Sequence, residues 1–249
     1  MSDTTSERVG KDLEHDHTPE AIRERLGSGP GKSYLRDWVY GGIDGAVTTF
    51  AVVSGVAGAQ LSSKIIVILG LANLVADGFS MAASNYSATR TEHEELERIR
   101  QIEYRHIRVN PDGEREEVRQ IFEGKGFVGE DLERVVGVVT ADADRWVQTM
   151  LSEEYGLPLA IRSPRVAALS TFSAFLVCGS VPLLPYFAKL ENAFDLSLGM
   201  TVVTFFVIGS AKSRWSIIPW WRSGLETLLI GSAAAGLAYA VGSLFAGIG

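Results

Sequence analysis

Two apolar stretches near the start of the chain each contain a single charged residue, and in both it is an aspartate. The stretches cover residues 38–63 and 65–89, and the aspartates are Asp44 and Asp77. Each stretch is longer than the roughly 20 residues with which an α-helix crosses a bilayer. An ionisable side chain costs about 2.5–3.5 kcal/mol at the centre of a membrane helix on insertion scales, so it usually marks an ion or proton path. The two aspartates therefore point to transport.

Three further apolar stretches lie in the second half of the chain. Residues 166–188 and 196–211 are uncharged, and residues 223–249 contain only Glu226. Pro182 and Pro185 are expected to kink or break the third helix near its end. The sequence thus predicts an all-α integral membrane protein with five transmembrane helices.

A strongly acidic segment separates the second stretch from the third. Residues 92–162 hold 17 of the 30 acidic residues and 10 basic ones, so their net charge of −7 equals that of the whole chain. Such a segment should attract cations and repel nucleic acid. Apolar residues recur in it at helical spacing, which predicts a small inserted helical domain. The chain then divides into an N-terminal segment (1–37), helices 1–2 (38–90), the acidic domain (91–162) and helices 3–5 (163–249).

The basic residues of the loops predict the orientation. They lie before the first span and between the fourth and fifth, whereas the loop between the third and fourth carries only Lys189. The positive-inside rule then places the N-terminus and the acidic domain in the cytoplasm and the C-terminus outside. The first 37 residues lack the pattern of a cleaved signal, and their His15 and His17 are interpreted as part of a solvated tail rather than as a metal site. The single cysteine, Cys178, excludes a disulfide within the chain.

The second span carries a line of ligand-type side chains. Asn73, Asp77 and Met81 are four residues apart, so they share one face of a helix. An amide, a carboxylate and a thioether together suit a first-row divalent metal better than Na⁺ or Mg²⁺. The alternative is that Asp77 pairs with Asn73 or a neighbouring helix while Met81 only packs. On the first span, Gly41 and Gly45 form a GxxxG pair next to Asp44, which would allow close helix approach, including approach between protomers.

The acidic domain offers three pairs of residues that each share a helix face. The pairs are Glu103 with His106, Glu114 with Glu117, and Met150 with Glu154. Converging carboxylates, an imidazole and a thioether would bind divalent iron or manganese. For any single glutamate a solvated charged face is the favoured alternative, and only the three pairs together support a metal site.

Several motifs resemble the vacuolar iron transporter family, in a bacterial form. They are YGGIDGAVTTFAVVSGVAGA, GFSMAASNY, EEVRQIF, WVQTMLSEEYGL and VPLLPY, in the family's order, from about residue 36 to the end. The resemblance implies a homodimer of five-helix protomers that moves Fe²⁺, often also Mn²⁺, out of the cytoplasm in exchange for protons. It also implies a cytoplasmic metal-binding domain between the second and third helices. For a bacterial member the expected location is the inner (cytoplasmic) membrane.

The resemblance also assigns roles to individual residues. The family's first-helix aspartate falls on Asp44, and its second-helix methionine falls on Met81. Its metal-domain ligands fall on a set of four residues: Glu114, Glu117, Met150 and Glu154. Three positions depart from the family: Asn73 and His106 stand where it has glutamates, and Leu151 stands where it has a second methionine. Asp77 supplies a carboxylate one turn after Asn73.

These observations predict a proton-coupled exporter of Fe²⁺, with Mn²⁺ as a second candidate cargo, which is not an enzyme and has no permanent cofactor. Its expected partners are metal ions, protons, the lipid bilayer and a second protomer, with no nucleic acid. A membrane-tethered metal sensor or store without transport is the main alternative. An intramembrane aspartyl protease would also need two aspartates on two helices, but the G-x-G-D signature is missing around Asp44. The acidic domain lacks the Glu-x-x-His repeats of di-iron bundles, which argues against ferroxidase chemistry.

Overall fold

The computed structural model describes residues 16–28, 31–158, 160 and 162–246. The expectation for His15 lies outside this part of the chain. The described residues form two compact units. We call residues 34–95 and 162–249 the helical bundle, and residues 1–33 and 96–161 the acidic unit. The helix α4 (Ser63–Val109) runs without a break through the boundary between them, so the domain limit expected at residue 90 falls inside a helix.

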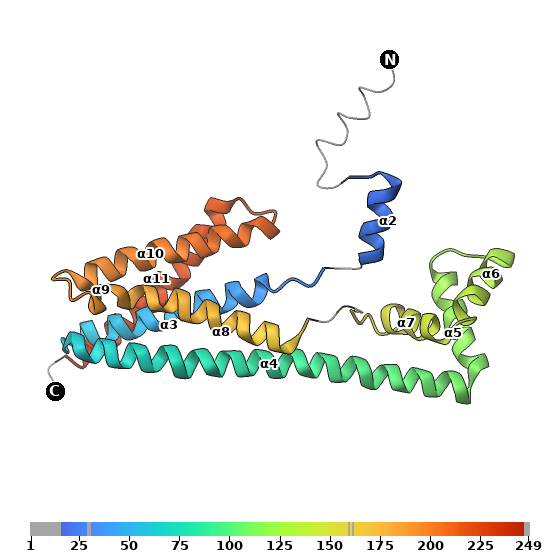
Figure 1. Cartoon of the computed structure of the whole chain (residues 1–249), viewed down its shortest axis with the longest axis horizontal. Coiled ribbons are helices and arrows are strands. Elements are labelled where there is room, and N and C mark those ends of the chain that lie inside the picture. Colours follow the sequence, from blue (N-terminus) through green and yellow to red (C-terminus); the bar gives the residue numbers. More distant parts are fainter. Residues whose placement is uncertain (1–15, 29–30, 159, 161, 247–249) are drawn as a thin grey trace, which may run out of the picture. The chain divides into compact units, whose positions relative to one another are not determined.

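The helical bundle contains the apolar helices (Figure 1). Beside α4 they are α3 (Leu35–Gly58), α8 (Pro164–Ser180) with its continuation to Phe187, α10 (Ala193–Lys212) and α11 (Trp220–Leu244). All five are long and apolar enough to cross a membrane. The prediction of an all-α chain with five such helices is confirmed.

The third span breaks where its prolines predict. The helix α8 ends at Ser180, a 3₁₀ turn covers Val181–Leu183, and the short helix α9 covers Leu184–Phe187. A proline inside a helix removes a backbone donor and crowds the preceding turn, which explains the change at Pro182. A second 3₁₀ turn, Ser213–Trp215, leads from α10 toward α11.

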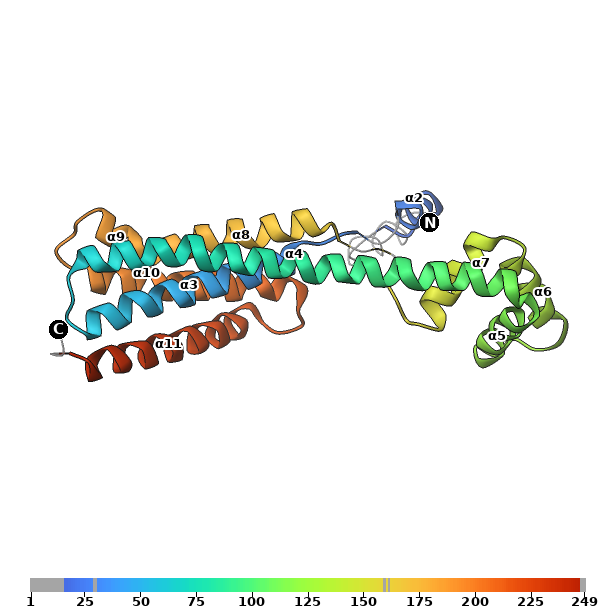
Figure 2. The same ribbon diagram turned by 90° about the horizontal axis from the view of Figure 1, so that it is seen from below.

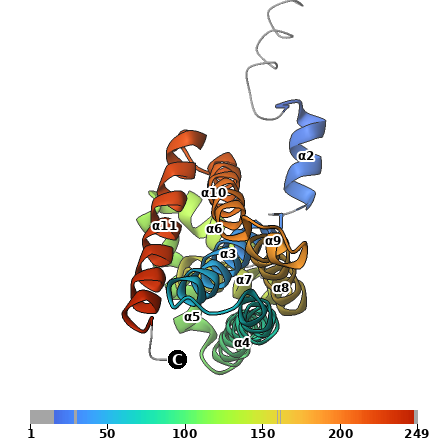
Figure 3. The ribbon, with the colours of Figure 1, turned by 90° about the vertical axis from the view of Figure 1, so that its left-hand side faces the viewer.

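The helix α3 lies among the other helices of the bundle (Figure 3). Its glycines allow close approach: a Cβ atom on Gly45 would come within 2.5 Å of the Phe175 carbonyl oxygen on α8, and one on Gly41 would collide with the backbone of Thr171. The GxxxG pair is thus covered by a helix of the same chain. The expectation that it offers a contact between protomers is therefore wrong, because α8 already occupies that face.

The acidic unit is built from the last turns of α4 and three shorter helices, which are labelled in Figure 2. These are α5 (Pro111–Gly124), α6 (Gly129–Thr140) and α7 (Ala143–Glu153). The Asn110 side chain accepts a hydrogen bond from the Gly113 amide and caps α5, and Asp142 caps α7 through the Arg145 amide. The unit also includes α2 (Pro19–Ser28), which buries none of its residues. Its apolar core combines all three shorter helices, with Val118, Val136 and Met150 fully enclosed.

Candidate metal path and metal-binding cluster

Polar side chains line the contact between α3 and α4 in the helical bundle. The Asn73 amide nitrogen donates to the hydroxyl oxygens of Thr48 (3.2 Å) and Thr49 (3.3 Å). The Thr48 hydroxyl in turn donates to the Asp44 carbonyl at 2.9 Å. One turn along α4 from Asn73, Asp77 lies close enough to Asp44 for the two carboxylates to repel each other. We call this line of polar residues the α3–α4 seam.

The seam brings together the two aspartates that the sequence singles out. Both are half-buried, and neither forms an ion pair with a basic residue among the residues described. Asn73, by contrast, donates to the threonines of α3 and not to Asp77, so the alternative of an Asn73–Asp77 pair is not observed. Met81 is half-buried and packs against the apolar core around Phe175. A cation or a proton between Asp44 and Asp77 would relieve their repulsion.

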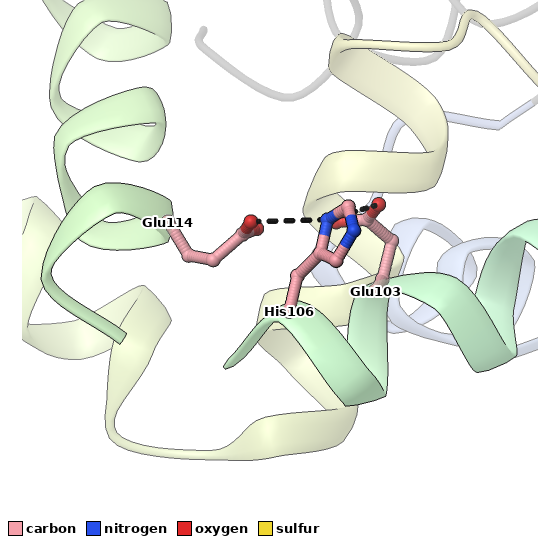
Figure 4. Close-up of side chains that lie close together, drawn as sticks. All are labelled: Glu103, His106 and Glu114. Atoms are coloured by element: carbon pink, nitrogen blue, oxygen red, sulfur yellow. Dashed lines mark ion pairs between the residues drawn. The ribbon is translucent and has the colours of Figure 1, made fainter. Parts of the chain in front are cut away.

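In the acidic unit, three of the predicted ligands converge (Figure 4). The Nδ1 atom of His106 lies 3.3 Å from Glu114 Oε1 and 3.8 Å from Glu103 Oε1. One ligand atom from each of the three lies within 4.8 Å of the others, and no other such group of His, Cys, Asp and Glu residues occurs in the described part of the chain. Helix α4 supplies Glu103 and His106, and the first turn of α5 supplies Glu114. The Asn110 cap fixes where α5 begins, and so places Glu114 opposite α4.

Burial makes this cluster costly when no cation is bound. Glu103 is 1% exposed and Glu114 is 5% exposed. The Oε2 atom of each is buried without a hydrogen-bond partner among the described residues. Burial raises the pKa of Glu114 to about 7, and the charges of Glu117 and Glu103 add to the rise. Buried carboxylates are normally paired with a cation or coordinate a metal. The histidine alone leaves one oxygen of each glutamate without a partner among the described residues.

Two more glutamates border the cluster. Partial burial, followed by the charges of Glu103 and Glu117, raises the pKa of Glu154. The side chains of both Glu117 and Glu154 are exposed, and their charges act on Glu114. Four carboxylates and one imidazole from α4, α5 and the end of α7 therefore interact electrostatically. The ligand atoms of Glu103, His106 and Glu114 are close enough for one divalent ion with bonds of roughly 2.0–2.4 Å.

Met150 takes a different place from the one the ligand interpretation suggests. It is fully buried in the apolar core of the acidic unit, together with Val118 and Trp146. Its burial is accounted for by packing alone, and its role as a soft ligand stays a prediction.

Sequence reasoning missed three functional candidates. The Tyr155 hydroxyl lies 3.1 Å from Glu103 Oε1 and donates to it. Asp37 on α3 is almost completely buried and forms an ion pair with Arg162 at 2.7 Å. Tyr155 directly follows Glu154, and Asp37 directly precedes the first apolar stretch, so both lie beside residues that the sequence did single out. Nothing local in the sequence indicates the partner of either.

Comparison with known proteins shows the family of the chain. A family model described as the VIT family matches residues 35–243. The vacuolar iron transporter of Toxoplasma gondii is 30% identical over 246 residues, which cover 92% of this chain and 82% of that protein. Vacuolar iron transporter 1 of Oryza sativa subsp. japonica is 31% identical over 232 residues, which cover 90% of this chain and 88% of that protein. Vacuolar iron transporter 1 of Arabidopsis thaliana is 30% identical over 211 residues, which cover 82% of this chain and 83% of that protein. The chain therefore belongs to the VIT family, and it is a multi-pass membrane transporter rather than an enzyme.

Proposed function

We propose that the chain exports Fe²⁺, and also Mn²⁺, from the cytoplasm in exchange for protons. The observation that carries the proposal is the cluster of Glu103, His106 and Glu114, in which two buried carboxylate oxygens have no hydrogen-bond partner in the part of the chain that the structure describes. Iron is named as the cargo in the matched relatives, and here it would be a substrate and not a resident cofactor. Oxygen and nitrogen donors without a thiolate suit divalent iron and manganese.

In this proposal the acidic unit collects the metal. Its negative charge raises the local concentration of cations, and Glu117 and Glu154 complete the ligand set around the buried cluster. Met150 would contribute a thioether only if its side chain leaves the core. The cluster then acts as a reservoir or as a gate for the ion that the bundle transports.

The bundle would carry the ion along the α3–α4 seam. Asp44 and Asp77 repel each other unless something positive neutralises them. A divalent ion and protons are alternative ways to do so, and their competition for the same carboxylates would couple metal movement to a proton gradient. Met81, one turn beyond Asp77, would offer a soft ligand. Asn73 would keep the seam in register by its bonds to α3 rather than bind metal directly.

The remaining expectations belong to the same proposal. They are a homodimer, a bacterial inner-membrane location, a cytoplasmic N-terminus and acidic unit, and an external C-terminus. The basic residues of the loops support this orientation through the positive-inside rule. Labelling of single cysteines from either side of intact cells would test it.

The decisive experiment is metal flux into proteoliposomes with an imposed pH gradient, with Fe²⁺ and Mn²⁺ tested separately. Flux should follow the gradient and should be lost in Asp44→Asn. Asp195→Asn, which alters an exposed carboxylate at the start of α10, is the matched control and should transport normally. Flux in Asp44→Asn equal to that of the unmodified protein would refute the path. Tight binding without flux in the unmodified protein would favour a membrane-tethered sensor or store.

A further inference from the structure

Asp37 forms a buried polar junction to which the proposed function assigns no role. Both of its carboxylate oxygens accept from the Arg162 guanidinium at 2.7 Å, and Oδ1 also accepts from the Asn85 amide at 2.9 Å. The same amide nitrogen lies 2.8 Å from the Thr171 hydroxyl oxygen. The junction joins α3, α4, the segment that leads into α8, and α8 itself. We call Asp37, Asn85 and Arg162 the junction.

The junction is the last polar level of the α3–α4 seam. The two helices pair Asn73 with Thr48, then Asp77 with Asp44, then Asn85 with Asp37. Residue numbers rise along α4 as they fall along α3, as expected for antiparallel neighbours. Asp37 precedes Asp44 by seven residues, about two helical turns or roughly 10 Å. A cation that moves along the seam from Asp44 toward the start of α3 would therefore meet the junction.

The junction also lies where the chain enters and leaves the bundle. Tyr34 is the first residue of the bundle and Arg162 is the first after the chain returns from the acidic unit. The Ser163 amide donates to the Tyr34 hydroxyl at 2.9 Å, and a ring nitrogen of His93 lies 2.9 Å from the Arg162 carbonyl oxygen. Segments from three separate passages of the chain are thus connected around one arginine.

The charge of Arg162 determines whether a cation can bind at Asp37. A guanidinium stays protonated in proteins, so Arg162 places a permanent positive charge at this end of the seam. Asp37 is neutralised by it and offers nothing to a second cation while the pair is closed. A divalent ion can occupy Asp37 only if Arg162 moves away. The ion and the arginine are therefore competitors for one carboxylate.

We propose that the Asp37–Arg162 ion pair is a gate at the end of the α3–α4 seam, which opens when a divalent metal replaces Arg162 on Asp37. The inference rests on the proposed transport of metal along this seam. Asp37 also accepts from Asn85, and this bond holds α3 and α4 in the register that brings Asp44 next to Asp77. A gate differs from a fixed structural bond because transport requires it to open.

The first test locks the gate covalently in the full-length protein. Cys178→Ser removes the single cysteine, and Asp37→Cys with Arg162→Cys places a pair for a reversible methanethiosulfonate cross-linker. Metal flux in proteoliposomes should fall to that of protein-free vesicles after cross-linking and should return on reduction. Undiminished flux in the cross-linked protein would overturn the gate, and failure to cross-link would contradict the proximity itself. Absence of flux in the unmodified protein would instead refute the proposed function.

A second test separates competition from simple scaffolding. Arg162→Gln removes the competing cation, so half-maximal flux should need less metal than in the unmodified protein. Asp37→Asn removes the carboxylate, so half-maximal flux should need more. A purely structural pair predicts the same defect in both variants, because each breaks the same bond, and that result would overturn the proposal. Arg165→Gln, which changes an exposed arginine at the start of α8, is the matched control.

Discussion

Replacing Glu114 by glutamine should stabilise the metal-free acidic unit and weaken its metal binding. The pKa of this carboxyl rises from 4.5 to about 7 in the folded protein, mainly because it is buried. One pKa unit corresponds to about 1.4 kcal/mol. Ionising Glu114 in the folded, metal-free protein therefore costs up to about 3.5 kcal/mol relative to the unfolded chain. Glutamine keeps the shape and the hydrogen-bonding capacity but carries no charge.

The sign of the pH dependence follows from the same pKa values. Below pH 4.5 Glu114 is protonated in both states and the cost is absent. Between pH 4.5 and about 7 the folded state retains a proton that the unfolded chain has lost, so stability falls as pH rises. Above pH 7 the full cost applies. A bound divalent ion neutralises the charge, so metal should stabilise the unmodified protein most at high pH.

Hydrogen–deuterium exchange of the full-length protein in detergent measures this effect locally. After correction for intrinsic exchange rates, peptides from α5 and α7 should gain protection in Glu114→Gln at pH 8, by up to the amount estimated above. The gain should shrink toward pH 5. Added Mn²⁺ should protect the unmodified protein and have little effect on the variant. Lower protection of the variant at pH 8 would refute the claim that the ionised carboxylate destabilises the fold.

Two further predictions concern packing and hydrogen bonding. Gly45→Ala should destabilise the bundle by about 1–3 kcal/mol or more, because its Cβ atom would lie 2.5 Å from the Phe175 carbonyl oxygen. Gly55→Ala on the same helix is the control: its Cβ atom would meet its nearest atom at 3.5 Å, so this substitution should be neutral. Thermal unfolding in detergent compares the two, and equal melting temperatures would contradict the packing. Tyr155→Phe removes the donor to Glu103 and should cost about 1–2 kcal/mol of local stability. It should also weaken Mn²⁺ binding, as calorimetry would show; unchanged affinity would mean that the phenol does not position the carboxylate.

The five apolar helices were predictable because charged residues are almost absent from whole stretches of sequence. The break in the third span was predictable as well, because a proline disrupts the helix at its own position. The start of the first helix was not. The sequence places it after Asp37, because a charged residue normally lies outside a span, whereas α3 begins at Leu35 and buries this aspartate. Its charge is compensated by Arg162, 125 positions away. No local pattern reveals such a partner, so the hydropathy boundary and the helix boundary differ.

In the candidate cluster, too, the sequence shows which residues share a helix face but not which helices meet. Glu103 and His106 share a helix face by their spacing alone, which the sequence displays. Their meeting with Glu114 depends on how α5 packs on α4, which only the structure provides. The helix pattern that placed Met150 beside Glu154 cannot tell a ligand from a core residue. The structure gives Met150 an apolar environment, and Tyr155 takes an unexpected place beside Glu103.

The carboxylates of this chain differ in how they are neutralised, and this difference bears on how an ion would move. Asp37 has a permanent cation, whereas Glu114 has a histidine whose charge depends on protonation. Asp44 and Asp77 have no basic partner among the described residues, and the charge of Asp77 acts on Asp44. A divalent ion gains most where negative charge is least compensated, so we expect the Asp44–Asp77 pair to attract such an ion. In the proposed exchange, protons would release an ion held there by neutralising the same carboxylates, and the absence of a fixed cation is what would leave these carboxylates open to both.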